Sequence, residues 1–388
     1  MPVIPQILER LDSLKEIRRD FHAHPEIGFE EVRTSGIVAD KLREWGVDEV
    51  HAGIGKTGVV GIVQGNQGPG RSIGLRADMD ALPIEEQTNL PWRSQTTGVM
   101  HACGHDGHTA ILLGAAQYLS ENRDFPGRIV LIFQPAEEGL GGARAMLADG
   151  LFERFPCDEV YGLHNSPYTS ENVVGIKPGV AMAGADFFDI EVQGVGSHAA
   201  SPQHAKDPIM AATALVQAFQ TIRSRNAPPN EAAVLSVTQF HAGAAYNVVP
   251  NDVSIAGTLR FFTDEARQRM RSRMQAIASG IAAAFEIEIQ VSFKDIFTVL
   301  ENNHALAEEV AKIARDVTGE DKVLIQQDAV TGSEDFADML KAVPGAYFTV
   351  GHKGEVPLHN PGFVFDDDSI PTAASMLVRV AERRLAAG

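Results

Sequence analysis

Short, strongly apolar runs separated by helical segments constrain the fold of this chain more than any other feature. Four such runs occur in the first half, at residues 58–63, 73–76, 129–133 and 160–163. Apolar residues at helical spacing, from about residue 107 to 122, lie between the second and third runs. Apolar strands that alternate with helices are typical of a parallel sheet covered by helices. The sequence therefore predicts an α/β domain whose ligands lie at the carboxyl ends of the strands.

The pattern changes near residue 183. The segments expected from there are strand 187–193, helix 208–223, strands 233–240 and 252–261, helix 263–285 and strand 286–293. Their order, βαββαβ, is that of a compact ferredoxin-like unit that can fold as an insertion. The α/β pattern then returns. We therefore expect a discontinuous first domain, residues 1–182 and 295–388, interrupted by an inserted domain at 183–294.

Composition argues against several functional classes. The formal net charge of −18, with no visible basic cluster, opposes binding to phosphate backbones or anionic lipid. The N-terminus lacks an apolar signal core, and no run approaches the roughly 18 apolar residues of a membrane span. Cys103 and Cys157 are the only cysteines, which excludes a disulfide framework. We therefore expect a cytoplasmic protein that binds neither nucleic acid nor membranes.

The segment from His101 to His108 holds three imidazoles, a thiol and a carboxylate in one loop that opens a predicted helix. Cys103 alone could be a small core residue, and any one histidine could cap a helix or donate a hydrogen bond. Imidazole and thiolate together, however, favour borderline-soft divalent ions such as zinc. The density of these groups therefore predicts a metal site.

Further candidate ligands follow the predicted strands. Glu137 and Glu138 come shortly after run 129–133, and adjacent carboxylates repel one another unless a cation or a proton intervenes. An exposed acidic turn is the alternative for this pair alone. His164 follows run 160–163, and His359 could join from a long loop. Residues 74–83 also leave a strand with two carboxylates, one of which could orient a ligand.

These motifs resemble those of the aminoacylase and carboxypeptidase group of dinuclear metallohydrolases, most closely its hippurate hydrolase and auxin-conjugate hydrolase branch. The similarity runs from the first predicted helix to the last. It rests on segments 20–26 (DFHAHPE), 76–80 (RADMD), 101–108 (HACGHDGH), 134–139 (QPAEEG), 194–199 (GVGSHA), 247–250 (NVVP), 257–260 (GTLR) and 332–336 (GSEDF).

The resemblance implies specific roles in a dinuclear centre. Two divalent metal ions, zinc or manganese with nickel or cobalt as alternatives, would be bound by Cys103, His105, Glu138, His164 and His359. Cys103 would bridge the two ions. Glu137 would be the general base that takes a proton from the bridging water as that water attacks the scissile carbonyl. Asp80 would be a supporting carboxylate near the metals.

The resemblance also implies that the inserted domain is a lid and dimerisation domain. His198 would stabilise the tetrahedral oxyanion, in its own subunit or in the partner's site. Asn247 and Arg260 would hold the substrate's free carboxylate, for which a guanidinium is suited because it pairs with carboxylate in a bidentate way. An arginine on a surface strand is the structural alternative for Arg260.

The expected function is hydrolysis of small N-acyl-L-amino acids, hippurate-like or acetylated, by a homodimer or higher homo-oligomer. A carboxypeptidase or dipeptidase is the alternative, because it would use the same water, base and metals. A metal-binding protein without turnover is a further class, and the presence of Glu137 argues against it. Redox chemistry at Cys103 would need a nearby second thiol, and Cys157 is distant in sequence.

Overall fold

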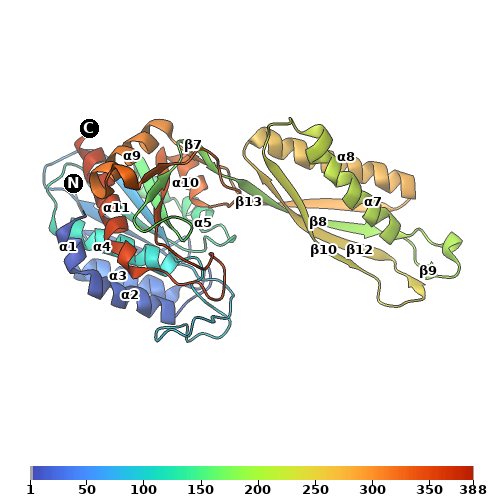
Figure 1. Cartoon of the computed structure of the whole chain (residues 1–388), viewed down its shortest axis with the longest axis horizontal. Helices are drawn as coiled ribbons and strands as arrows, with labels where there is room; N and C mark the ends of the chain where they lie inside the picture. Colours follow the sequence, from blue (N-terminus) through green and yellow to red (C-terminus); the bar gives the residue numbers. More distant parts are fainter. Residues whose placement is uncertain (1–2, 388) are drawn as a thin grey trace. The chain divides into compact units, whose positions relative to one another are not determined.

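The computed structural model describes residues 3–387, which divide into two compact units. Unit 1 contains the chain up to Ala181, residues Leu300–Ala329 and the chain from Asp335 onward. Unit 2 consists of Met182–Val299 and the short segment Val330–Glu334. Figure 1 follows the chain through both units, with unit 2 in green to orange. Unit 2 thus extends a few residues beyond the inserted domain expected at 183–294.

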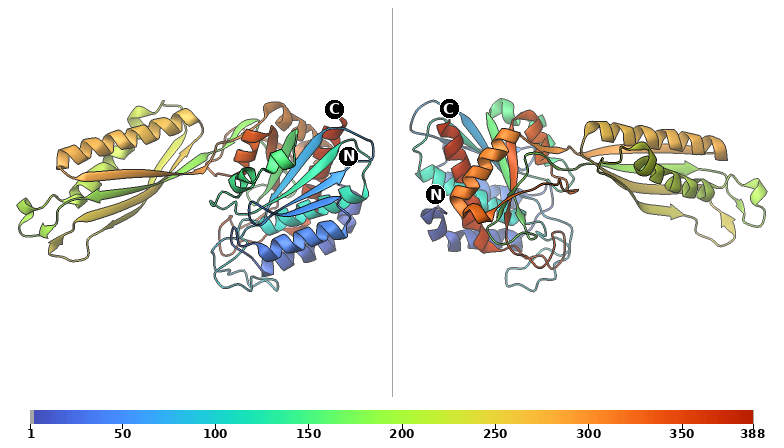
Figure 2. Two further views of the ribbon diagram at one scale, coloured as in Figure 1. Left: turned by 180° about the vertical axis from the view of Figure 1, so that it is seen from behind. Right: turned by 45° about the horizontal axis from the view of Figure 1, so that its top comes forward.

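The core of unit 1 is an eight-stranded mixed sheet (Figure 2). Its strands, in spatial order, are β1 (Glu49–Ile54), β2 (Gly58–Gln64), β4 (Arg128–Gln134), β3 (Ser72–Asp78), β5 (Glu159–Ser166), β16 (Gly345–Gly351), β6 (Val174–Ile176) and β15 (Val323–Ile325). The central strands β4, β3, β5 and β16 are parallel neighbours, whereas β1–β2, β2–β4 and β16–β6 are antiparallel pairs. The predicted α/β class with a mainly parallel central sheet is confirmed.

Helices pack against this sheet. The helices of unit 1 are α1 (Pro5–Glu9), α2 (Leu11–Ala23), α3 (Val32–Glu44), α4 (His105–Glu121), α5 (Gly142–Ala148), α6 (Leu151–Arg154), α9 (His304–Thr318), α10 (Phe336–Ala342) and α11 (Ile370–Ala386). Helices α4 and α11 contact β3, and α9 contacts β16. Between α1 and α2, the Arg10 N–H donates to Ile7 O, the tight i to i−3 geometry that ends a helix.

Unit 2 has the order βαββαβ. Its elements are β8 (Gly184–Gln193), α7 (Pro208–Thr221), β10 (Ala233–Ala242), β12 (Asp252–Phe261), α8 (Asp264–Phe285) and β13 (Glu288–Phe297). The strands form an antiparallel sheet in the order β10-β12-β8-β13, and alternate residues of β12 are buried. Of the helices in residues 3–387, including the long α8, none combines the length and apolar character needed to cross a membrane.

A buried charge cluster ties the strand ends of unit 1 together. Arg76, on β3, has a fully buried side chain that donates to Gln134 Oε1 (2.8 Å), Asp78 Oδ2 (2.7 Å) and Asp335 Oδ1 (3.2 Å). Asp335 also accepts from Gln134 Nε2 (2.7 Å) and from the N–H of Ala143 (2.9 Å). Buried charges are tolerated when they are paired and hydrogen-bonded in this way. The cluster therefore fixes the ends of β3 and β4 relative to the start of α10.

This cluster makes Arg76 a critical residue for stability. Replacing it by Met should lower the free energy of unfolding by about 3–5 kcal/mol, because two carboxylates would remain buried without their cation. Urea denaturation followed by circular dichroism measures this loss. Arg43→Met is the matched control, because Arg43 pairs with Asp40 on the surface with its side chain 55% exposed, and it should cost well under about 1 kcal/mol. Equal losses in the two variants would contradict the assignment.

Candidate metal centre

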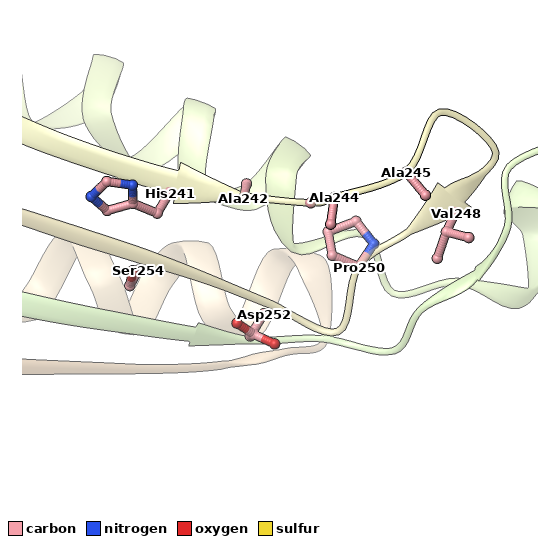
Figure 3. A pocket seen from close by; sticks show the side chains of 9 residues that line it. His241, Ala242, Ala244, Ala245, Val248, Pro250, Asp252 and Ser254 are labelled. Atoms are coloured by element: carbon pink, nitrogen blue, oxygen red, sulfur yellow. The ribbon is translucent and has the colours of Figure 1, made fainter.

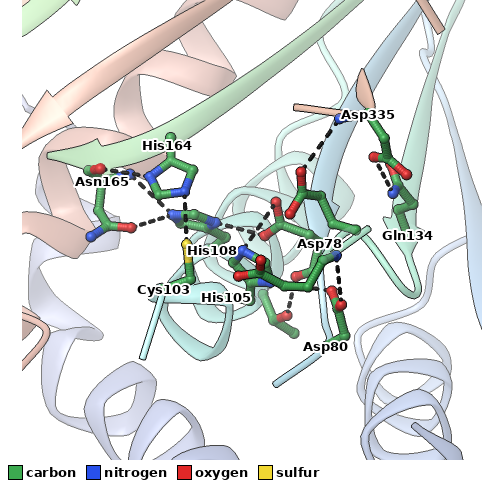
Figure 4. Close-up of polar contacts among 12 residues, drawn as sticks. Asp78, Asp80, Cys103, His105, His108, Gln134, His164, Asn165 and Asp335 are labelled. Atoms are coloured by element: carbon green, nitrogen blue, oxygen red, sulfur yellow. Dashed lines mark hydrogen bonds and ion pairs between the residues drawn. The ribbon is translucent and has the colours of Figure 1, made fainter. Parts of the chain in front are cut away.

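Six side chains from four segments converge near the carboxyl ends of β3, β4 and β5. Figure 4 labels Cys103, His105 and His164 among them. Their ligand atoms lie within 4.8 Å of one another in three overlapping groups: Cys103, His105 and His164; Cys103, Glu138 and His359; and His105, Glu137 and Glu138. The groups share members, so all six side chains form one continuous cluster. His164 lies inside β5, not after it as expected, because β5 continues to Ser166.

His105 and His164 each turn one ring nitrogen toward the cluster and use the other in a hydrogen bond. His105 Nδ1 lies 3.2 Å from Asp80 Oδ1, so it carries the proton, and His105 Nε2 has no hydrogen-bond partner. His164 Nδ1 donates to the backbone oxygen of Asn165 (2.6 Å), while its Nε2 lies 3.3 Å from Cys103 Sγ. Histidines that bind metals usually donate their other ring N–H to a carboxylate or carbonyl in this way.

Asp80 holds two parts of the cluster at once. Its side chain is buried; Oδ1 faces His105, and Oδ2 accepts from the backbone N–H of Glu138 (3.0 Å). The single carboxylate of Asp80 therefore orients both the imidazole of His105 and the backbone of Glu138.

Glu137 follows a strained turn after β4. Ala136 has φ 53°, in the left-handed region that residues with a side chain rarely adopt. The Gly142 N–H closes the turn by donating to Ala136 O (3.0 Å). Glu137 is buried, and its Oε1 lies 3.4 Å from the Asp335 N–H that donates to it. The carboxylate of Glu137 is thus held beside His105 and Glu138.

His359 closes the cluster from a surface loop. Its side chain is 52% exposed, and its Nε2 lies 3.2 Å from Glu138 Oε1. Its backbone also has a left-handed φ of 62°, and its N–H donates to Ala102 O (2.8 Å). Hydrogen bonds to Cys103 and Glu138 raise the pKa of His359 to about 10. Burial and the neighbouring Glu138 raise the pKa of the Cys103 thiol.

The donors of this cluster fit divalent cations. His105 Nε2 is a buried polar atom without a hydrogen-bond partner. Such an atom is costly in a protein interior unless something satisfies it. A cation in the cluster would accept its lone pair and would favour the thiolate form of Cys103. A mixture of thiolate, imidazole and carboxylate suits zinc and similar first-row ions.

Residues that were not singled out as site residues support the cluster from behind. His108 Nδ1 lies 2.6 Å from Asp78 Oδ1, and its Nε2 lies 2.7 Å from Asn165 Oδ1. Although burial raises the pKa of Asp78, His105, His108 and Arg76 hold it well below its usual range. One sequence feature pointed to these supporting residues. Arg76 lies in a run predicted to be a buried strand, where a charged side chain needs a charged or polar partner.

A second buried network anchors the start of α4 to α2. Asp106 accepts from Arg18 NH1 (3.0 Å) and faces His22 Nδ1 at 2.8 Å. Burial lowers the pKa of His22, but its hydrogen bonds to Asp106 and Glu86 outweigh this effect and raise the pKa to about 9. The helix that begins with His105 is therefore held by an ion pair as well as by packing.

Unit 2 separates its three predicted site residues into two places. His198, in β9 (Ser197–His198), pairs with Val248 of β11 (Val248–Val249), and the Ala199 N–H donates to Asn247 O (3.0 Å). Arg260 instead stands at the far end of β12, opposite Ala185. A strand of 10 residues spans roughly 30 Å. His198 and Asn247 are neighbours, whereas Asn247 and Arg260 of one chain cannot hold the same carboxylate.

The surroundings of these residues differ. Near Asn247, a cavity of about 440 Å³ opens beside the 242–250 loop and is lined by residues such as Ala244, Val248 and Asp252 (Figure 3). Arg260 is half-buried, and burial lowers its pKa. Its guanidinium donates to Leu259 O (3.1 Å) and to Thr258 Oγ1. Within residues 3–387, no carboxylate lies at ion-pair distance from Arg260.

Comparisons with known proteins agree with this geometry. The model of peptidase family M20/M25/M40 matches residues 74–383. Hippurate hydrolase of Campylobacter jejuni is 43% identical over 386 residues, covering 99% of this chain and 100% of the relative. Thermostable carboxypeptidase 1 of Saccharolobus solfataricus is 38% identical, covering 94% and 93%. The crystal structure of a dinuclear metal binding peptidase from Bacillus subtilis is 33% identical, with a TM-score of 0.84 over 98% of this chain and 99% of that one.

These similarities extend over almost the whole chain, and they confirm the resemblance that the motifs predicted. The chain belongs to peptidase family M20/M25/M40.

Proposed function

We propose that this protein is a metal-dependent amidohydrolase that cleaves N-acyl-L-amino acids to a carboxylic acid and a free amino acid. The observation that carries the proposal is the cluster of thiol, imidazole and carboxylate donors with Glu137 beside it. The similarity to a hippurate hydrolase over the full length of both chains supports the substrate class.

In this proposal two divalent ions, zinc or manganese with nickel or cobalt as alternatives, are held by Cys103, His105, Glu138, His164 and His359. When bound, they supply Lewis acidity and lower the pKa of water. Glu137 accepts the proton of the attacking water on its carboxylate and returns it to the leaving amine. Asp80 keeps His105 and the Glu138 backbone in place during this exchange.

Unit 2 is, in this proposal, the lid and dimerisation domain. Arg260 takes the substrate's free α-carboxylate, because it is a half-buried guanidinium without a carboxylate partner in the described chain. His198 and Asn247 act in the site of the partner subunit of a homodimer, with His198 at the oxyanion. The length of β12, which lies between them and Arg260, supports this division between two subunits.

A carboxypeptidase activity is the second candidate, favoured by the relative of that name at 38% identity. Both reactions release an amino acid whose α-carboxylate is free in the substrate. They differ in the group on the acyl side, which is an acyl chain in one case and a peptide in the other. The substrate panel below separates them.

Purified protein loaded with each metal should release amino acid faster from benzoyl- and acetyl-amino acids than from dipeptides or acylated dipeptides. Faster cleavage of peptides would favour the carboxypeptidase.

Arg260 should determine the preference for a free α-carboxylate, so substrates whose α-carboxylate is amidated should be cleaved poorly. Arg260→Lys should lower kcat/KM roughly 10- to 1,000-fold on the free acid, about 1.4–4 kcal/mol, because lysine lacks the bidentate geometry. This loss should nearly vanish on the amidated analogue. Arg223→Lys, at an exposed arginine of the same unit, is the control.

Glu137 and Glu138 should separate in function. Glu137→Gln should abolish turnover and retain metal, because an amide cannot accept the proton of the water. Glu138→Gln should lose metal as well as activity. Metal analysis after dialysis, together with amino-acid release, measures both effects, and Glu171→Gln, at an exposed glutamate, is the control. Equal metal loss in the two variants would show that the roles are wrongly divided.

Shared sites should be detectable by subunit mixing. His198→Ala and Glu137→Gln proteins are each expected to be inactive. Dimers that contain one subunit of each should recover part of the activity, because one of their two sites would combine an intact Glu137 with the partner's intact His198. His204→Ala, at an exposed histidine of the same unit, should be fully active by itself. Verified mixed dimers without recovery would confine each site to one chain.

A further inference from the structure

Glu31 is a buried carboxyl group that the proposed reaction does not use. It stands at the N-cap position of α3, where a side chain usually accepts from the first backbone N–H groups of the helix, yet it makes no such bond. Its Oε1 instead accepts from the N–H of Ala136 (2.8 Å), and its Oε2 accepts from Thr57 Oγ1 (2.5 Å). Glu31 thus reaches across to the turn that carries Glu137.

The environment of Glu31 is unfavourable for a carboxylate. Its residue is fully buried, and no Lys, Arg or His lies at ion-pair distance from it within residues 3–387. Burial raises the pKa of Glu31, and the charge of Asp80 raises it further. A buried charge without a cation is costly, and stability alone would favour another residue here. The two hydrogen bonds therefore point to a role other than holding α3.

The hydrogen bond that Glu31 accepts comes from a strained part of the site. Ala136 is buried, has φ 53° and directly precedes Glu137. A side chain at Gly28 would come within 2.9 Å of Ala136 Cα, so the backbone at residue 28 closes one side of the turn. Left-handed backbone at a residue with a side chain persists only where the surroundings hold it. The hydrogen bond from Ala136 N–H to Glu31 is a direct restraint on that conformation.

We propose that Glu31 is a positioning residue for Glu137, acting through the backbone N–H of Ala136. Glu31 holds the left-handed turn, and the turn fixes where the Glu137 carboxylate stands relative to His105 and Glu138. The inference rests on the proposed function only in giving Glu137 the part of the base. This role requires a side chain at position 31 that is long enough to place an accepting oxygen at the Ala136 N–H, and it does not require a negative charge.

Two substitutions at Glu31 test this assignment. Glu31→Met keeps the length of the side chain and removes the acceptor, and should lower kcat 10- to 100-fold, because small displacements of a catalytic group cost about this much. KM and metal content should stay within about 3-fold of the parent, as expected when only transition-state interactions are lost. Glu31→Gln retains an accepting oxygen and should keep kcat within about 3-fold. Loss of activity in Glu31→Gln equal to that in Glu31→Met would overturn the proposal.

Glu26 provides the matched control. It lies close to Glu31 in sequence and accepts from the N–H groups of Arg33 (2.9 Å) and Thr34 (2.8 Å) in the first turn of α3. Glu26→Met should therefore destabilise the same helix without changing kcat by more than about 3-fold. Thr57→Val removes one of the two restraints on Glu31 and should give an intermediate loss, so it serves if Glu31→Met does not fold. An equal fall in kcat for Glu26→Met and Glu31→Met would reduce the role of Glu31 to helix stability.

Hydrogen exchange of segment 134–139 tests the contact without any enzymatic activity. In chelator-treated protein, the Ala136 amide should exchange at least 10-fold faster in Glu31→Met than in the parent, and should stay protected in Glu31→Gln and Glu26→Met. Unchanged protection in Glu31→Met would overturn the proposal even if the variant were inactive. Faster exchange in a protein that hydrolyses none of the N-acyl amino acids would support the restraint and refute the proposed function instead.

Discussion

Arg76 places a full positive charge inside the central sheet, and much of the site is arranged around satisfying it. Its guanidinium is completely buried and is met by Asp78, Gln134 and Asp335. Two of these partners also make other contacts. Asp78 faces His108, and Asp335 accepts from Ala143 and donates its own N–H to Glu137. Because a buried arginine is costly unless its partners stay in place, its contacts with Asp78, Gln134 and Asp335 are maintained. Through Asp335, the same contacts hold the start of α5 and Glu137 against the sheet.

The donors for metal are oriented by groups that stand behind them. Asp80 sets His105 and the backbone of Glu138, the carbonyl of Asn165 sets His164, and Ala102 O accepts from the backbone of His359. In His105, the contact with Asp80 leaves Nε2 buried and without a hydrogen-bond partner. The cost of such an atom in a protein interior explains why the chemistry of these residues points to cations and not to a hydrogen-bonded core.

The sequence predicted those parts of the structure that depend on local pattern. The apolar run at 129–133 and the strand expected at 252–261 correspond to β4 and β12, because strands with buried faces leave a clear hydrophobic pattern. Strand β1 was missed, since most of its residues are partly or fully exposed. The residues expected to bind metal were identified from motif chemistry and from the family resemblance, and the structure brings them into one cluster.

Other features depend on pairs far apart in the chain. The contact between Arg76 and Asp335 joins residues 259 positions apart, which no local pattern reveals. The separation of Asn247 from Arg260 depends on the length of β12 and on its register against β8. Glu31 stands at the N-cap position of α3, yet its side chain accepts from the N–H of Ala136, 105 positions away.

The chain enters and leaves unit 2 through two strands that pair with each other. Strand β7 (Gly179–Met182) and β14 (Leu300–Asn302) form a two-stranded sheet, although unit 2 lies between them in sequence. Bringing their ends together across a flexible loop of about 120 residues would cost roughly 4 kcal/mol in chain entropy. If unit 2 is already folded, most of these residues are ordered, and the remaining loss of chain entropy on pairing the two strands is smaller. Folding of unit 2 thus brings β7 and β14 close together and lowers the entropic cost of pairing them.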